Sequence, residues 1–96
     1  MTIFEYKMGN YDDDLKCIRL EGFEEKPKSY KSERRIIKKD NIGKMISYYG
    51  MAMSVYLLEE NEKEAKKIFT NHIEKLKQSA IEKVELRERQ LRAVQE

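Results

Sequence analysis

The residues best placed to do chemistry are a run of lysines and arginines in the middle of the chain. Residues 26–44 hold eight basic residues against two acidic ones, a local net charge of +6, whereas the whole 96-residue chain carries +2. Basic side chains neutralise phosphates, and tyrosine rings stack on bases. We therefore predict a partner-binding or nucleic-acid-binding surface formed by Lys28, Lys31, Arg34, Arg35, Lys38, Lys39, Tyr30 and Tyr48. A lysine-rich edge strand that protects a sheet from aggregation is the alternative interpretation, and it has the advantage that no known binding motif accompanies the charge.

Other residues of reactive or metal-binding type give weaker signals. Asp12, Asp13 and Asp14 are consecutive, so their side chains cannot converge on one cation, and a solvated turn is the better interpretation. His72 falls among apolar helix positions without a Cys or Asp spaced to share a metal, which predicts a boundary residue of the core. Cys17 lies in a predicted strand without a histidine partner, so we expect a small buried hydrophobic residue.

Enzyme motifs are not recognisable in this sequence. It has no Gly-rich phosphate loop, no Ser-His-Asp order and no paired-carboxylate arrangement, and 96 residues are few for a large active-site cleft. We therefore expect no catalytic activity, no cofactor and no metal. Met45, Met51 and Met53 suit an adaptable binding surface, although filling of the core is the default interpretation.

The composition predicts one domain over residues 1–96. Charged residues make up 40% of the chain, and the single cysteine excludes an intrachain disulfide. No apolar run is long enough for a signal peptide or a membrane span. We expect a soluble cytoplasmic protein in a reducing compartment, without a membrane partner.

The first half of the chain has the patterns of short strands. Residues 2–8 alternate, with Phe4, Tyr6 and Met8 on one side of an extended chain. Pro27 cannot donate to a strand ladder and marks a strand end, an edge or a turn. The pattern further predicts a turn over residues 9–14, a second strand over 15–24 and a third strand over 30–38.

The segment before the long helix is open to two interpretations. Residues 40–46 predict one or two helical turns with Asp40 as N-cap. Residues 48–59 fit either a helix or a strand; we favour a strand, since Val and Tyr prefer one and a natural turn follows at 59–61. One face of that strand would hold Met51, Met53, Val55 and Leu57. A helix there would instead make the protein mostly α-helical.

A long helix is predicted from Asn61 to the C-terminus. Asn61 and Glu64 have the spacing of a capping box, and neither Gly nor Pro interrupts the chain beyond them. Apolar residues recur at eleven-residue intervals, as in Phe69, Ala80 and Leu91, which favours a nearly straight helix.

Such a helix must extend beyond its own domain. Thirty-five residues span about 52 Å at about 1.5 Å each, whereas a compact domain of this size has a radius of gyration of about 12–13 Å. The residues beyond about Ser79 either pack on a second copy, pack on a different partner or fray. We favour the second copy, which makes the protein a homo-oligomer. The predicted oligomerisation residues are Ala80, Val84, Leu91 and Val94.

The chain resembles small uncharacterised accessory proteins of Firmicute phages and mobile elements. The resemblance is one of pattern and covers residues 23–30, 34–44, 56–59 and 65–69. In those proteins a few strands lead into a charged C-terminal helix. The resemblance implies a factor that binds a host or defence protein and inhibits or redirects it, as anti-CRISPR proteins do.

Together these patterns predict an α+β fold: a small antiparallel sheet of three or four strands followed by one long C-terminal helix packed on it. The favoured functional hypothesis is a non-enzymatic phage-type accessory protein that binds and modulates a host macromolecule, such as a CRISPR nuclease. One alternative is direct DNA or RNA binding through residues 26–44. The other is a structural module that oligomerises through its helix.

Overall fold

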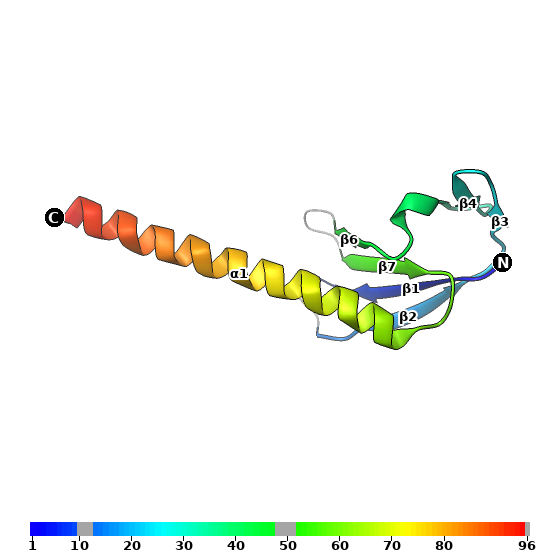
Figure 1. Cartoon of the computed structure of the whole chain (residues 1–96), viewed down its shortest axis with the longest axis horizontal. Coiled ribbons are helices and arrows are strands. Elements are labelled where there is room, and N and C mark those ends of the chain that lie inside the picture. The colour runs from blue at the N-terminus through cyan, green and yellow to red at the C-terminus, as the bar shows by residue number, and fades with distance from the viewer. Residues whose placement is uncertain (10–12, 48–51, 96) are drawn as a thin grey trace.

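The computed structural model describes residues 1–9, 13–47 and 52–95 of the chain. It is an α+β structure in which short strands precede one long helix (Figure 1). The elements are β1 (Ile3–Met8), β2 (Lys16–Leu20), β3 (Glu24–Glu25), β4 (Ser29–Lys31), β5 (Ile36–Lys38), a 3-10 turn (Lys39–Asn41), β6 (Met45–Ser47), β7 (Met53–Leu57) and α1 (Glu62–Gln95).

A four-stranded antiparallel sheet forms the centre of the molecule, with the strand order β2-β1-β7-β6. Strand β1 pairs with both β2 and β7, so that Tyr6 lies opposite Val55 and Glu5 lies opposite Tyr56. Because side chains alternate along a strand, this register sends Tyr6 and Glu5 to opposite faces of the sheet. Different elements of the structure therefore pack on the two faces of the sheet.

The first half of α1 covers one face of this sheet. Phe69 is only 3% exposed, and Ala65 beside it is completely buried. Their partners are alternate residues of β1 and β7, and the whole buried cluster comprises Tyr6, Met53, Val55, Leu57, Ala65 and Phe69. Apolar helix residues one turn apart thus meet an apolar sheet face, which is the pattern of an amphipathic helix on a sheet.

A second, three-stranded antiparallel sheet of order β3-β4-β5 packs on the opposite side. Its residues Tyr30 and Ile37 lie opposite each other in the β4–β5 register, and both are buried. With Ile3 of β1 and Phe23 they form a second apolar cluster, against which Tyr56 also packs. The β-domain, residues 1–60, thus has α1 on one side of its central sheet and the small sheet on the other.

The start of α1 is capped as the sequence predicts. The Asn61 side-chain oxygen accepts a hydrogen bond from the Glu64 backbone N–H at 3.0 Å, and Glu62 and Glu64 lie in the first turn. Carboxylates at this end are favourable, because the N-terminus of a helix carries a partial positive charge. The predicted helix and its N-cap are therefore confirmed.

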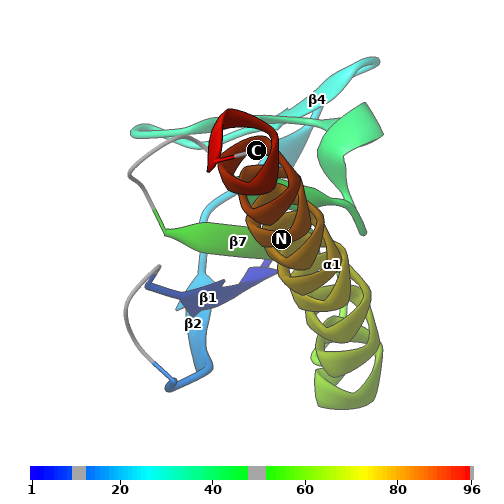
Figure 2. The same ribbon diagram turned by 90° about the vertical axis from the view of Figure 1, so that its left-hand side faces the viewer.

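The helix extends far beyond the strands, as its length requires. The molecule measures 63 × 24 × 18 Å, and its radius of gyration of 18.0 Å exceeds the value of about 12–13 Å expected of a compact domain. Seen from its C-terminal end, the helix stands out in front of the sheets (Figure 2). The side view shows no described strand beside its distal half (Figure 1).

Several local predictions are wrong. Residues 30–38 form two strands, not one, because a turn at 32–35 folds β5 back on β4. Residues 40–46 give only a short 3-10 turn followed by β6, and the residue at its N-cap is Lys38, not Asp40. The second strand is shorter than predicted, since β2 ends at Leu20 and a turn at Gly22 with positive φ precedes β3.

Other predictions are confirmed over the described residues. Strand β7 buries Met53, Val55 and Leu57 together, which selects the strand over the helix, while Met51 lies outside the described residues. Met53 and Met45 contribute to the core. His72 is partly buried, as expected of a boundary residue. Cys17, in contrast, is exposed, because β2 is an edge strand that α1 does not cover.

Phe69→Ala should destabilise the β-domain strongly. Removing a buried phenylalanine ring loses apolar burial and leaves a cavity, a loss of about 3–5 kcal/mol in the free energy of unfolding. The neighbouring exposed residue provides the control, and Thr70→Ala should change this free energy by less than about 0.5 kcal/mol. Urea titrations followed by circular dichroism measure both. Equal effects of the two substitutions would show that α1 does not stabilise the sheet.

Candidate functional site

Strands β4 and β5 with their connecting turn carry most of the predicted basic residues. The Ser32 N–H donates to the Arg35 carbonyl at 2.9 Å, and the Arg35 N–H donates to the Ser32 hydroxyl at 3.2 Å. These bonds close the turn that connects β4 to β5. Among the outward-pointing cations are four exposed side chains that form no ion pair with any described residue, and we call them the basic hairpin: Lys28, Lys31, Arg34 and Lys38.

Two of the predicted binding cations have structural partners instead. Arg35 Nη1 lies 3.5 Å from a carboxylate oxygen of Glu5. Lys39 Nζ lies 3.4 Å from a carboxylate oxygen of Glu25 and 5.4 Å from the centre of the Tyr30 ring. These contacts stay within the β-domain, so Arg35 and Lys39 are less available to an external partner than the four members of the basic hairpin.

The predicted stacking role of the tyrosines is corrected in part. Tyr30 is only 6% exposed and belongs to the second apolar cluster, so its ring cannot stack on a base. Its position opposite Ile37 in the β4–β5 ladder turns it toward the central sheet. Tyr48 lies outside the described residues.

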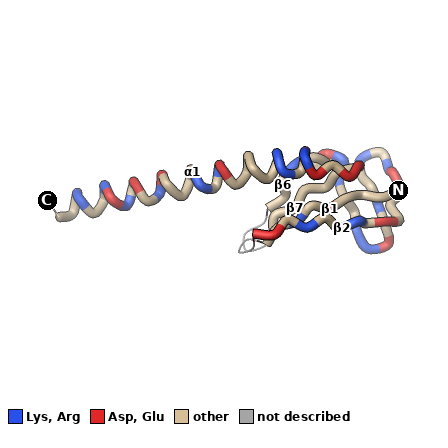
Figure 3. Tube along the Cα trace, turned by 90° about the horizontal axis from the view of Figure 1, so that it is seen from below, with Lys and Arg blue, Asp and Glu red and all other residues tan. Residues whose placement is uncertain are grey.

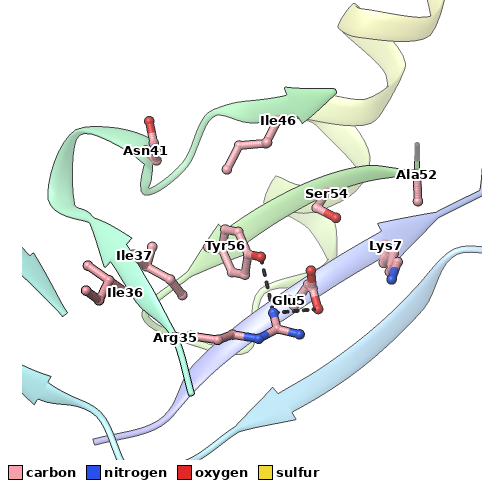
Figure 4. A pocket seen from close by; sticks show the side chains of 10 residues that line it. All are labelled: Glu5, Lys7, Arg35, Ile36, Ile37, Asn41, Ile46, Ala52, Ser54 and Tyr56. Carbon is pink, nitrogen blue, oxygen red and sulfur yellow. Dashed lines mark hydrogen bonds and ion pairs between the residues drawn. The ribbon is translucent and has the colours of Figure 1, made fainter. Parts of the chain in front are cut away.

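A cleft of about 460 Å³ lies between the central sheet and β5 (Figure 4). At its base Glu5 is only 4% exposed, and Arg35 reaches over it from the second sheet. The same Arg35 nitrogen donates a hydrogen bond to the Tyr56 hydroxyl at 3.3 Å. Ser54 and Lys7 also line the cleft.

The chemistry of this cleft is that of a structural ion pair. Burial raises the pKa of the Tyr56 hydroxyl above its ordinary value, and the charge of Glu5 adds to this effect, so Tyr56 is a neutral hydroxyl at neutral pH. Arg35 compensates the buried carboxylate, and Glu5 has no described histidine or cysteine beside it in the cleft. The arrangement therefore ties the second sheet to the first.

The distal half of α1 forms a second candidate surface. The four predicted oligomerisation residues lie there and are all exposed, with Val84 and Leu91 each 57% exposed. Ile73 and Leu76 continue the same side of the helix toward the β-domain. We call this set the distal stripe: Ile73, Leu76, Ala80, Val84, Leu91 and Val94. Acidic and basic residues are interspersed along the helix (Figure 3).

No family model, curated protein or solved structure matches the chain. Within the described ranges, no group of His, Cys, Asp and Glu side chains is arranged to hold a metal ion. Of the consecutive aspartates, Asp13 and Asp14 are exposed, whereas Asp12 lies outside those ranges. The helix α1 is too polar to cross a membrane.

Sequence reasoning missed Glu5 as the centre of the cleft. The alternation that turns Tyr6 toward the helix also turns Glu5 to the opposite face, next to Ile3. A carboxylate on a buried face signals a hidden partner. That partner, Arg35, is thirty positions away and is brought close only by the second sheet, which the sequence did not reveal.

Arg35→Ala should lower the free energy of unfolding by roughly 1–3 kcal/mol, because it leaves the buried Glu5 carboxylate without its charged partner. The Arg35 side chain is partly exposed, so water can replace some of the lost interaction, and the lower part of that range is expected. Arg34→Ala is the matched control and should have an effect below about 0.5 kcal/mol.

Urea titration measures both variants, and a double-mutant cycle with Glu5→Gln isolates the coupling of the pair. The double variant should lose less stability than the two single variants combined, because neither residue then leaves a buried charge unpaired. Strict additivity, or an Arg35→Ala effect no larger than that of Arg34→Ala, would contradict the assigned role.

Proposed function

We propose that the protein is a non-enzymatic binding protein that assembles through its protruding helix and presents the basic hairpin to a macromolecular partner. One observation carries the proposal: the apolar distal stripe continues along α1 after the β-domain has ended, and its side chains are exposed.

The energetics of a lone helix support this proposal. Most helical stability in proteins comes from the packing of an apolar face on the rest of the structure, not from intrinsic helix propensity. Burial of one large apolar side chain contributes about 1.5–3 kcal/mol. Packing of the distal stripe on another chain would therefore stabilise the distal half of α1, which receives no such contribution from the β-domain.

The resemblance to phage-type accessory proteins supplies a biological context for the partner. In that context the partner is a host or defence protein, and a nucleic-acid enzyme such as a CRISPR nuclease is the proposed target. Nucleic-acid enzymes carry surfaces that bind or imitate phosphate backbones, and a cationic hairpin is complementary to acidic surfaces. The basic hairpin is the proposed contact with such a target.

Truncation after Lys77 should convert an oligomer into a folded monomer. The truncated chain keeps Ala65 and Phe69, which pack on the sheet, and loses most of the distal stripe. Light scattering after size exclusion gives the mass of each protein, and circular dichroism reports whether the β-domain remains folded. A full-length monomer, or a truncated protein that keeps the full-length oligomer's mass, would overturn the proposed assembly role.

Direct nucleic-acid binding is the second candidate, and the basic hairpin favours it. Its four cations are exposed and have no ion-pair partner among the described residues, so they are free to neutralise phosphates. Contacts with phosphates release counterions, and the affinity then depends steeply on salt.

If all four cations contact duplex phosphates, the logarithm of the affinity should fall with the logarithm of salt concentration with a slope of about −3.6. Fluorescence anisotropy with random duplex and single-stranded DNA measures this slope. Charge reversal by Lys31→Glu with Arg34→Glu should weaken binding to every sequence, whereas Lys16→Glu with Lys63→Glu, two exposed cations elsewhere, should have a much smaller effect. Absent or salt-independent binding would remove this candidate.

A further inference from the structure

The distal stripe has a spacing that reads the same in both directions along the helix. Ile73, Ala80, Val84 and Leu91 are separated by seven, four and seven residues. Reversing the chain direction about Glu82 exchanges Ile73 with Leu91 and Ala80 with Val84. A second copy running antiparallel would therefore place an apolar side chain opposite each of these four residues.

We infer that the distal stripe docks on the same stripe of a second copy in an antiparallel helix pair centred near Glu82. This inference rests on the proposed assembly function and adds to it the partner, the orientation and the register. The overlap from Ile73 to Leu91 covers about 27 Å of each helix. Val94 lies beyond this overlap, because it would be level with Thr70 of the other copy, next to Phe69, where the β-domain already covers this side of the helix.

The position of Arg87 fits this register. Arg87 lies on the same side of the helix as the distal stripe, on the flank that meets Leu76 of the second copy and within one residue of its level. Its guanidinium donates a hydrogen bond to the Gln90 side-chain oxygen at 2.8 Å, which holds the charged group on the flank of the helix. The aliphatic stem of the arginine is then left to cover the leucine.

Charges beside the stripe are also complementary in this arrangement. Lys77 and Glu88 are eleven residues apart and therefore lie within about 20° of each other around the helix, on one flank of the stripe. Neither forms an ion pair with a described residue. In the antiparallel register, Lys77 of each copy lies on the same flank as Glu88 of the other and within one residue, about 1.5 Å, of its level, and the two-fold symmetry makes this contact occur twice.

A parallel pair of helices is sterically and electrostatically unfavourable. The β-domain packs on Phe69, which precedes Ala80 by eleven residues and so lies on the same side of the helix as the distal stripe. Parallel stripes would bring two β-domains to the same end and into the space between the helices. They would also place Arg87 opposite Arg87. The antiparallel pair puts the β-domains at opposite ends.

Site-directed disulfides in the full chain test this register. All proteins carry Cys17→Ser, which removes the exposed native thiol. One protein carries Ile73→Cys and the other, with a size tag, Leu91→Cys. A disulfide requires Cα atoms within about 7 Å, whereas the two copies of position 73 would be about 27 Å apart in the antiparallel pair. Oxidation of the mixture should give the mixed dimer, and oxidation of either protein alone should give none.

Lys75→Cys mixed with Arg89→Cys provides the matched control. These two positions are level with each other in the same register but lie on the opposite side of the helix, so they should not cross-link. Non-reducing gels separate the three possible dimers by size. Light scattering on each reduced protein confirms that the substitutions leave its mass unchanged.

The outcomes separate this inference from the proposed function. Disulfides formed by each protein alone would show a parallel pair and overturn the inference. A full-length oligomer that becomes a monomer on truncation after Lys77, but gives no mixed disulfide, would also overturn the inference. The proposed assembly role of the helix would then remain. A monomeric full-length protein would overturn both. The mixed disulfide alone, without the control product, supports the antiparallel pair.

Discussion

The packing of Phe69 and Ala65 on the central sheet is the contact on which the rest of the molecule depends. It anchors a helix of 34 residues by its first two turns and directs the remaining turns away from the sheet. The β-domain is too small to cover the whole apolar side of α1, since the described strands end while that side continues. The distal stripe is therefore exposed because the helix is longer than the β-domain on which it packs.

On the other face of the sheet, a buried ion pair attaches the second sheet to the central sheet. Glu5 occupies a position that alternation turns away from the helix, and Arg35 compensates it from the second sheet. An ion pair of this kind is sensitive to the removal of either member and contributes less when both are absent. It also explains why the basic region is not uniformly available: part of its charge holds the β-domain together.

The sequence predicted the features that depend on local pattern. The cap at Asn61, the helix, the first strand and the apolar face of β7 follow from spacing and side-chain type, and the structure confirms them. The wrong predictions concern features that depend on contacts between residues far apart in the sequence. Strands of two or three residues, such as β3 and β5, have too few positions to show an alternation, and the partner of Glu5 became visible only in three dimensions.

The eleven-residue repeat also fixes the direction in which the β-domain faces. Eleven residues are slightly more than three turns, so Phe69 and Ala80 differ by only about 20° around the helix. Losing one residue between them would turn the distal stripe by about 100° about the helix axis while leaving both halves of the helix intact. An added repeat of eleven would lengthen the molecule by about 16 Å and keep that angle. The number of residues between Phe69 and the distal stripe therefore sets both the distance of the stripe from the β-domain and its rotation about the helix axis.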